Sequence, residues 1–600
     1  MSVANSVLRP SWSARLLWWL IPLVVALWAG WDLLAPWDVN GHSVYLNHIR
    51  LVALEATLRE GGLSLRWLPQ LYFGHGSPLF NYVAPLPTLL ALVLVWMGLS
   101  ASMAIKLVYL GALLGAALST AWLARILAGP WAGLGAGVLV VLAPYALVNV
   151  YVRAQFGEPV ALALAPLALV AVHRLDGPRP WRSVALGACA VGLLVLSHNI
   201  AALMLFALVA AAVAAKIWAH PRRELVLRGA VFLGLGLGLS AWLWLPALAE
   251  TSAVQARAAL TSGPFAYDLH FVTFGQLLGD SWGYGVSGPG DQDSMPLQAG
   301  RALLLLWAAG ALLTARRWRE TPALARVMVL AAPVALFLTT AASAPLWRHV
   351  PLLPFMQFPW RFLLLFCLAA AVTAGLALGD LAGRLHPPWR EIVLGLTVVL
   401  IVVMSQHQVN AMYLRFNLAT HESAIFVKNN GPSIDQDPNL VPIGEVYTAS
   451  NIVRLGVSAT IGDDYLPRAV EDKPRAPSSQ PVEVIAGALQ VISGNSAPQR
   501  HSAVLRVDQD ARLRFPLFYF PGWIARLDGT EIPVEVEPRS GCIVIDVPRG
   551  EHELVLQFAS TPLRSVSTLL SLLAGMAVLV LLLGSWWACR RRAITPAPVA

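Results

Sequence analysis

Titratable side chains are concentrated in one polar stretch, residues 37–83, which lies between strongly apolar segments. Its first members are Asp38, His42 and His48. A carboxylate in such a loop could act as a general base toward an acceptor hydroxyl, and Asp38 could help to hold a divalent cation. The alternative is structural, because Asp38 could instead cap a helix that begins near Val39.

Two arginines and a glutamate stand at the boundaries of apolar segments. Arg153 and Glu158 share a short turn, and Arg361 opens an apolar segment in the run FMQFPWRF. Guanidinium groups suit phosphate oxygens, and a carboxylate that faces residues 37–83 could share in proton transfer. The alternatives are a local Arg153–Glu158 ion pair and, for Arg361, a long side chain that reaches lipid headgroups.

His198 and Asn199 form a third polar group, which falls between two apolar segments. Polar side chains at membrane depth are costly unless they are hydrogen-bonded or line a cavity. The pair therefore indicates either a ligand-binding position or a hydrogen-bonded cap in a helix–helix turn.

The elements that must position these residues are membrane-spanning helices. Of the 600 residues, 57% are hydrophobic and 12% are charged, and the mean hydropathy is +0.63. Soluble domains carry about 25% charged residues, so the composition predicts a polytopic α-helical membrane protein. The apolar candidate spans are 16–36, 84–99, 103–126, 131–150, 157–172, 183–197, 200–217, 228–248, 301–315, 323–343, 361–382, 391–406 and 565–588.

Charge and cysteine usage exclude other classes. The net charge is +9, but the basic residues cluster in short loops, as expected for cytoplasmic loops, so no nucleic-acid partner is predicted. The four cysteines form no CxxC pair, and neither a zinc site nor a disulfide framework is indicated.

The same basic loops predict the topology, with both termini in the cytoplasm. We expect a membrane domain at 1–406, with a first periplasmic loop at 37–83 and a second at 249–300. An alternating pattern predicts a periplasmic β domain of sandwich type at 407–564, followed by a final span at 565–588 and a cytoplasmic tail at 589–600.

Counting crossings gives one further constraint. The turn at Glu158 and the loop at 37–83 are both expected outside, so an even number of crossings must separate them. Segment 84–99 is short and opens with Pro85 and Pro87. We therefore expect it to be re-entrant or half-inserted, which leaves about 12 of about 12–13 helices crossing the membrane.

Several motifs resemble a known family. The runs REGGLSLRWLPQLYFGHGSPLFNYVAPLP, YVRAQFGEPVALALAPLAL, LSHNIAAL and MQFPWRFL, with DDYLP at 463–467 and FYFPGWIARLDGTEI at 518–532, resemble bacterial membrane proteins labelled 6-pyruvoyl-tetrahydropterin synthase-related. That family is similar in layout to the C-type glycosyltransferases, which use polyprenyl-phosphate-linked sugars. The resemblance implies an acid and a histidine in a pattern G-H-D-x-x-x-H-x-x-R. Here Ser43 and Asn47 stand at those two positions, whereas Glu158, His198, Asn199 and Arg361 match their motifs.

The resemblance implies a glycosyltransferase in the bacterial inner membrane, with its site at the periplasmic face. It would move a sugar from a polyprenyl-phosphate donor to a lipid-linked glycan or another envelope acceptor. Asp38 or Glu158 would be the base, with a divalent cation as a cofactor that Asp38 could bind. His42, His48, Arg153, His198, Asn199 and Arg361 would bind substrate or phosphate. The alternative is a non-catalytic transporter, flippase or assembly factor for envelope polysaccharide, which Ser43 favours.

Overall fold

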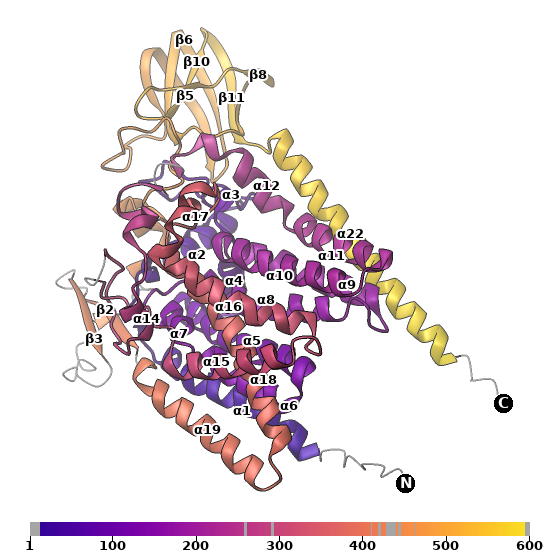
Figure 1. Cartoon of the computed structure of the whole chain (residues 1–600). Coiled ribbons are helices and arrows are strands. Elements are labelled where there is room, and N and C mark those ends of the chain that lie inside the picture. Colours follow the sequence, from indigo (N-terminus) through magenta and orange to yellow (C-terminus); the bar gives the residue numbers. More distant parts are fainter. Residues whose placement is uncertain are drawn as a thin grey trace.

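The computed structural model describes residues 12–256, 261–289, 293–409, 411–417, 422–427, 440–441, 446–460 and 462–594. Figure 1 shows a bundle of helices with a β sheet beyond one end. Parts of the expected β domain at 407–564, and residues 595–600 of the expected tail, lie outside the described residues.

The helical part confirms a polytopic membrane protein. In the described residues, six helices are long and apolar enough to cross a membrane, or up to nine if three bent helix pairs each count as one span. Every predicted span coincides with a helix or with such a pair. These helices are α1 (Trp12–Ala29), α4 (Leu86–Trp96), α5 (Ala101–Ala128), α6 (Pro130–Val141), α7 (Pro144–Tyr151), α8 (Gly157–His173), α9 (Pro180–Ser197), α10 (Asn199–Ala219), α11 (Arg223–Leu239), α12 (Ala241–Ala249), α15 (Arg301–Arg316), α16 (Ala323–Thr339), α18 (Leu363–Arg384), α19 (Trp389–Ser405) and α22 (Pro562–Ile594).

Three pairs of consecutive helices are bent at a short break between their two members. The bends are 43° between α6 and α7, 72° between α11 and α12, and 91° between α16 and the segment 341–349 that contains α17 (Ala344–His349). Pro144 is the first residue of α7, where a proline fits the start of a new helix but cannot continue the previous one. The sequence interpretation gave 131–150, 228–248 and 323–343 each as one span and did not include these three bends.

Contacts gather the expected outer loops at one end of the bundle, which we call the first-loop end. The hydroxyl of Tyr151, at the end of α7, donates to Ala29 O at the end of α1. The side chain of Asn199, at the start of α10, donates to the carbonyl of Tyr82 in the first loop. At the end of α16, Thr339 O accepts a hydrogen bond from Val272 N of the loop 249–300.

Residues on both sides of helix α4 contact the first-loop end, Tyr82 through Asn199 and Ser102 through Asp38. Helix α4 has 11 residues, or about 16 Å at 1.5 Å per residue, against a hydrocarbon core of about 30 Å. The next helix, α5, begins beside the first loop, because Ser102 Oγ donates to Asp38 Oδ2. Helix α4 is therefore too short to cross such a core, and Glu158 comes to the same end as Asp38; the half-inserted placement of 84–99 stays a prediction.

The first loop contains short elements around one longer helix. Strand β1 (Asp38–Val39) precedes α2 (Val44–Arg59), and α3 (Leu79–Tyr82) leads into α4. Helix α2 ends before Gly61, which has a φ of +87° that favours glycine. Asp38 lies in a strand and caps no helix, so the capping alternative was wrong. The other short helices in the described residues are η1 (Trp31–Leu34), η2 (Thr251–Ala253), η3 (Gly263–Phe265), η4 (Tyr267–Leu269), α14 (Phe274–Leu278), η6 (Ala341–Ser343), η7 (Pro354–Met356), η8 (Pro359–Phe362), η9 (Gln406–Gln408) and α21 (Ala449–Leu455).

Two antiparallel sheets follow α19. A four-stranded sheet pairs β1 with β2 (Met412–Asn417), and β2 with β3 (Glu422–Val427) and β4 (Leu440–Val441). Its register sets Asp38 opposite Leu414, so the first loop is an edge strand of this sheet. The second sheet has seven strands: β5 (Glu483–Ala497), β6 (Arg500–Phe518), β7 (Trp523–Leu527), β8 (Thr530–Ile532), β9 (Glu535–Val536), β10 (Cys542–Val547) and β11 (Gly550–Phe558).

The seven-stranded sheet forms the predicted C-terminal β domain. Strand β6 pairs with β11 through its first half and with β10 through its second half, while β5 runs along its other edge. The sheet therefore has two halves joined along β5 and β6. Alternate residues of β6 such as Leu505, Val507, Leu513 and Phe515 are buried.

A buried ion pair ties the last span and the sheet to the first loop. Arg564, at the start of α22, is 1% exposed and binds Glu250 Oε2 through Nε and Nη2 at 3.1 and 2.9 Å. Asn81 of α3 donates to the same oxygen at 2.8 Å and accepts from Arg66 at 2.8 Å. Because these charges are buried, removing one partner would cost about 3–5 kcal/mol. The seven-stranded sheet is thereby fixed against the first-loop end, as Figure 1 shows.

The topology gives the first prediction. If basic loops face the cytoplasm, alkaline phosphatase fused after Pro477 should be active, and a fluorescent protein fused at the C-terminus should fold and fluoresce. Phosphatase activity and fluorescence in intact cells report the location of residue 477 and of the C-terminus. An inactive phosphatase after Pro477, together with fluorescence of a fluorescent protein fused at the same point, would reverse the orientation.

Candidate functional site

A buried triad of charges lies at the first-loop end. Glu158, which is 0% exposed, accepts from Arg153 Nη1 at 2.8 Å and lies 3.6 Å from Arg361 Nε. Tyr145 OH donates to Glu158 Oε2 at 3.1 Å. Both arginines are also buried. The triad therefore holds two guanidinium groups around one carboxylate.

Local backbone features place Glu158 in this position. Gly157 begins α8, and a Cβ there would lie 2.2 Å from Ser197 O and 2.8 Å from His198 Cβ. Only glycine allows α8 to start this close to the α9–α10 turn. The break after α6 directs α7 so that Asn149 accepts from Arg153 and Tyr145 reaches Glu158.

Arg361 is positioned by the motif that precedes it. Gln357 has a backbone φ of +64°, in the left-handed region that residues other than glycine adopt only at a cost in energy. In that conformation Gln357 Oε1 accepts from Arg361 Nη1 at 2.7 Å, and Met356 O accepts from the same nitrogen at 2.8 Å. Nε of Arg361 has no hydrogen-bond partner in the described part of the chain.

Aromatic rings cover both guanidinium groups. Arg153 lies 4.5 Å from the Trp360 ring, and Arg361 lies 4.8 Å from the Phe358 ring. The two rings stack at 4.7 Å with an interplanar angle of 8°. Burial alone would lower the pKa of Arg153, but the adjacent Glu158 carboxylate outweighs it and raises that pKa. Arg153 therefore stays charged.

His198 and Asn199 lie at the edge of this triad. His198 Nδ1 accepts from Ala201 N at 3.1 Å, so the side chain caps α10. The same imidazole is close enough to interact electrostatically with Glu158 and Arg361. Asn199 donates to Tyr82 O. The helix-cap alternative therefore describes His198, and the ligand-binding position stays a prediction.

Asp38 and His48 form a separate buried group. Asp38 Oδ1 lies 3.4 Å from His48 Nε2, and Asp38 Oδ2 accepts from Ser102 Oγ at 3.0 Å. Burial would raise the pKa of Asp38, but His48 and Lys106 together hold it below its ordinary value. The small cavity beside this group is lined by Asp38, Asn47, His48, Lys106, Tyr109 and Ala154, and does not include Glu158.

These residues do not suit a divalent cation. No group of three or more histidine, cysteine or acidic side chains that could hold a metal occurs in the described ranges. Lys106 adds a positive charge beside Asp38 and donates to Trp37 O at 2.9 Å. A cation there would meet an ammonium group and only one carboxylate.

The first loop and the Arg153 turn are bonded through their backbones. His42 N and Ser43 N donate to Val152 O and Arg153 O at 3.1 and 3.0 Å. Asn47, which stands where the resemblance implies a histidine, donates to Ala154 O at 2.9 Å. His42 Nε2 lies 3.1 Å from Gly285 O, and burial, followed by the charge of Arg153, lowers the pKa of His42. Through these bonds the Asp38 and Glu158 groups become neighbours.

The sequence interpretation missed one acidic residue at this site, Asp464. Arg50 of α2 donates to Ala459 O at 3.0 and 2.8 Å, which brings residues 459–467 against the first loop. Asp464 lies within electrostatic range of both Arg50 and Arg361. The available signal was the motif DDYLP, but no local pattern shows which distant segment its carboxylates will meet.

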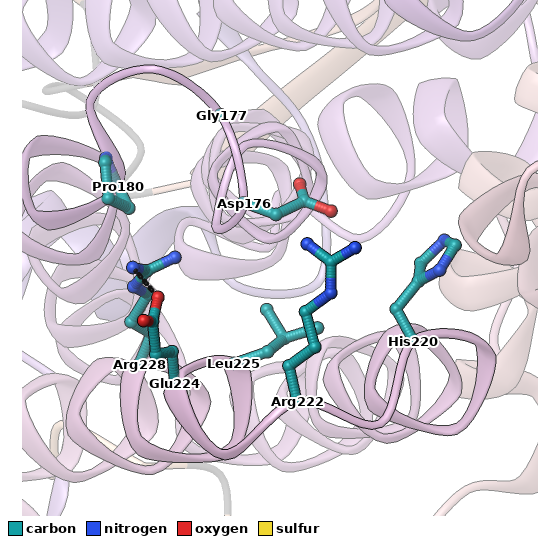
Figure 2. Close-up of a pocket in the computed structure, with 8 residues that line it drawn as sticks. All are labelled: Asp176, Gly177, Pro180, His220, Arg222, Glu224, Leu225 and Arg228. Carbon is teal, nitrogen blue, oxygen red and sulfur yellow. Dashed lines mark hydrogen bonds and ion pairs between the residues drawn. The ribbon is translucent and has the colours of Figure 1, made fainter.

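Another cavity lies away from these residues. Figure 2 shows it between the α8–α9 turn and the start of α11, lined by Asp176, His220, Arg222, Glu224 and Arg228, with a volume of about 270 Å³. Arg228 donates to Glu224 at 2.5 Å. None of the predicted site residues lines this cavity, and it belongs to the basic loops expected in the cytoplasm.

The fold and the buried charges define a multi-span helical membrane protein with a polar site at one end of its bundle. A family model described as "6-pyruvoyl-tetrahydropterin synthase related domain; membrane protein" matches residues 80–412, which is more than half of the chain. The chain belongs to this family, which confirms the resemblance predicted from the sequence.

The chain is also similar to solved structures of membrane enzymes. The match to the Archaeoglobus fulgidus oligosaccharyltransferase covers 67% of this chain and 57% of that protein, with 14% identity and a TM-score of 0.40. For the mycobacterial arabinofuranosyltransferase AftD the shares are 66% and 27%, with 17% identity and a TM-score of 0.42. For ArnT from Cupriavidus metallidurans bound to undecaprenyl phosphate they are 65% and 64%, with 14% identity and a TM-score of 0.35. No curated protein matches the sequence.

The close approach at Gly157 gives the second prediction. Gly157→Ala would place a Cβ 2.2 Å from Ser197 O and force α8 away from the α9–α10 turn. Overpacking of this kind costs about 1–3 kcal/mol, so the melting temperature of the detergent-purified protein should fall. Gly234→Ala in α11 is the matched control, because no atom lies within 4 Å of its Cβ. Equal melting temperatures for the two variants would contradict this account of Glu158 placement.

Proposed function

We propose that this protein is a membrane glycosyltransferase that moves a sugar from a polyprenyl-phosphate-linked donor to a cell-envelope glycan or lipid acceptor. The observation that carries the proposal is the buried triad, in which Arg153 and Arg361 converge on Glu158. It lies at a helix boundary, where the phosphate of a lipid-linked donor would meet the protein while its chain stayed among the spans.

The charges of the triad support a phosphate ligand. Two guanidinium groups and one carboxylate leave one surplus positive charge, and the nearby imidazole of His198 is engaged as a helix cap. Arg361 Nε carries a donor without a hydrogen-bond partner among the described residues. A phosphate oxygen would satisfy this donor, and burial would strengthen the interaction.

The reaction needs positive charge where the leaving phosphate develops its own negative charge. Attack of an acceptor hydroxyl on the anomeric carbon breaks the bond between the sugar and the phosphate oxygen. Arg153 and Arg361 would stabilise that oxygen in the transition state. The aromatic faces of Trp360 and Phe358 exclude water from the guanidinium groups, which strengthens the same interaction.

The two carboxylates expected to be catalytic receive different roles in this proposal. A carboxylate whose charge is already neutralised by adjacent cations is a weak base. We assign to Glu158 the positioning of Arg153 and Arg361, and to Asp38 the orientation of His48 and the first loop. His42 and His48 would lie beside the acceptor, at the face that the basic loops predict to be periplasmic.

The alternative is a non-catalytic flippase or assembly factor, which the serine at position 43 favours. The structure adds the three bent helix pairs, since broken helices also occur in transporters. The two functions differ in their products. A transferase creates a lipid-linked glycan that is absent without it, whereas a flippase changes only the side of the membrane on which an existing glycan is found.

The third prediction tests the phosphate role of Arg361. Lipid-linked glycans from a deletion strain should lack a species that wild-type protein restores. Arg361→Lys keeps the charge but loses the guanidinium fork, and hydrogen bonds to charged groups contribute about 1.5–3 kcal/mol. We therefore expect the restored species to fall by roughly 10- to 100-fold, as measured by mass spectrometry.

Arg348→Lys, at an exposed position of α17, is the matched control. Full output from a folded Arg361→Lys protein would show that Arg361 is only an anchor. An unchanged glycan profile in the deletion strain would remove the transferase proposal itself.

A further inference from the structure

The triad and the Asp38 group leave the proposed reaction without a free proton acceptor. Both oxygens of Asp38 contact partners, His48 and Ser102, with Lys106 nearby. Glu158 lies between two guanidinium groups and is 0% exposed. An acceptor hydroxyl needs a base within about 3 Å or one water away. A third carboxylate must therefore be found at the same end.

Asp464 differs from both because no salt-bridge partner lies within 4 Å of it in the described residues, whereas Asp38 and Glu158 each have at least one. Asp464 is half-buried, whereas Glu158 is 0% exposed. Asp464 Oδ1 is buried and has no hydrogen-bond partner in the described ranges. Burial, with the neighbouring charge of Asp463, raises its pKa to about 6 even though Arg50 and Arg361 act in the opposite direction. A carboxylate with these properties can take up a proton near neutral pH.

The segment around Asp464 is held on both sides. Asp463 has a φ of +53°, accepts from Tyr72 OH at 2.9 Å and pairs with Lys473. Tyr465 stacks on Tyr82 at 5.0 Å with an interplanar angle of 2°. The backbone beyond it is fixed because Leu466 O accepts from Gln255 N at 3.0 Å. Asp464 is therefore presented by a rigid turn and not by a loose loop.

The glycine at position 462 leaves room for the Asp464 carboxylate. A Cβ added at Gly462 would lie 2.6 Å from Asp464 Oδ1. Arg50 holds Ala459 of the same segment through two hydrogen bonds, and Arg361 belongs to the triad. A neutralising role alone would place Asp464 in an ion pair with Arg50 or Arg361. The described residues show no such pair within 4 Å, although both arginines lie within electrostatic range.

We propose that Asp464 is the general base of the transfer reaction, an inference that rests on the proposed function. The acceptor hydroxyl oxygen forms a bond to the anomeric carbon, and its proton moves to Asp464. The bond between that carbon and the phosphate oxygen breaks, and the polyprenyl phosphate leaves with the electron pair beside Arg153 and Arg361. Asp464 then returns its proton to solvent.

The proposal predicts a pH dependence that depends on Asp464. The base must be ionised, and a raised pKa of about 6 means that it is protonated, and inactive, at lower pH. Transfer should therefore rise with pH through about 6 and level off above it. General bases contribute about 10²- to 10⁴-fold to rate. The transfer rate of Asp464→Asn should therefore be at least about 100-fold lower at pH 7.5, and it should no longer fall as the pH drops below about 6.

The test uses membranes from the deletion strain carrying full-length wild-type or variant protein, with their own lipid-linked donor and acceptor. The product is quantified by mass spectrometry between pH 5 and pH 8. Gly462→Ala keeps the acid but displaces it and should also slow transfer. Asp463→Asn is the control. Its transfer rate should still fall at low pH, but the fall should occur at a lower pH than in the wild type, because Asp463 raises the pKa of Asp464.

The outcomes separate the two proposals. If wild-type membranes form no product that the deletion strain lacks, the proposed function fails, and the role of Asp464 fails with it. If wild-type protein forms product and a folded Asp464→Asn variant shows the same rate and the same fall at low pH, the function stands and Asp464 is not the base. Folding is checked by the melting temperature of each purified variant, and Asp464→Glu should restore part of the rate.

Discussion

The burial of Glu158 between two arginines is the interaction on which the first-loop end depends. Arg153 comes from the turn after α7, Glu158 from the first turn of α8, and Arg361 from the segment that opens α18. A buried carboxylate without these partners would cost several kcal/mol, because ions lose their hydration in the interior. The ion pairs therefore require the 153–158 turn and the distant segment at Arg361 to meet at one depth. The close approach at Gly157 and the left-handed Gln357 make that meeting sterically feasible.

Much of the fold could be predicted because a lipid bilayer restricts the chain to few solutions. Apolar length located every span, and counting the crossings between basic loops showed that 84–99 had to return to its starting side. That parity argument is what placed Glu158 with the first loop. The bends were less predictable, because an apolar pattern continues through a break. Pro144 was a readable signal, yet 131–150 was interpreted as one straight span.

The site could be predicted only where the chemistry is local. Arg153 and Glu158 are five residues apart in the sequence, and Arg361 stands at a visible boundary between polar and apolar residues. Asp38 was found, but its partners were not, because they depend on tertiary contacts with Ser102 and on strand pairing with Leu414. Asp464 lies in a motif that the family resemblance covers, but its neighbours are defined only when Arg50 binds the carbonyl of Ala459.

The three acidic groups at this end differ in how their charge is balanced, and this difference orders their roles. Asp38 faces Lys106 and a histidine and is neutralised where it lies, so it can hold the first loop but attracts no anion. Glu158 leaves a surplus positive charge on its two arginines, so its surroundings suit a phosphate. Asp464 has opposite charges nearby but touches none of them in the described residues, and its buried Oδ1 has no hydrogen-bond partner among them. The proposed roles in structure, phosphate binding and proton transfer therefore fall on three different carboxylates, because one side chain cannot be both tightly paired and free to accept a proton.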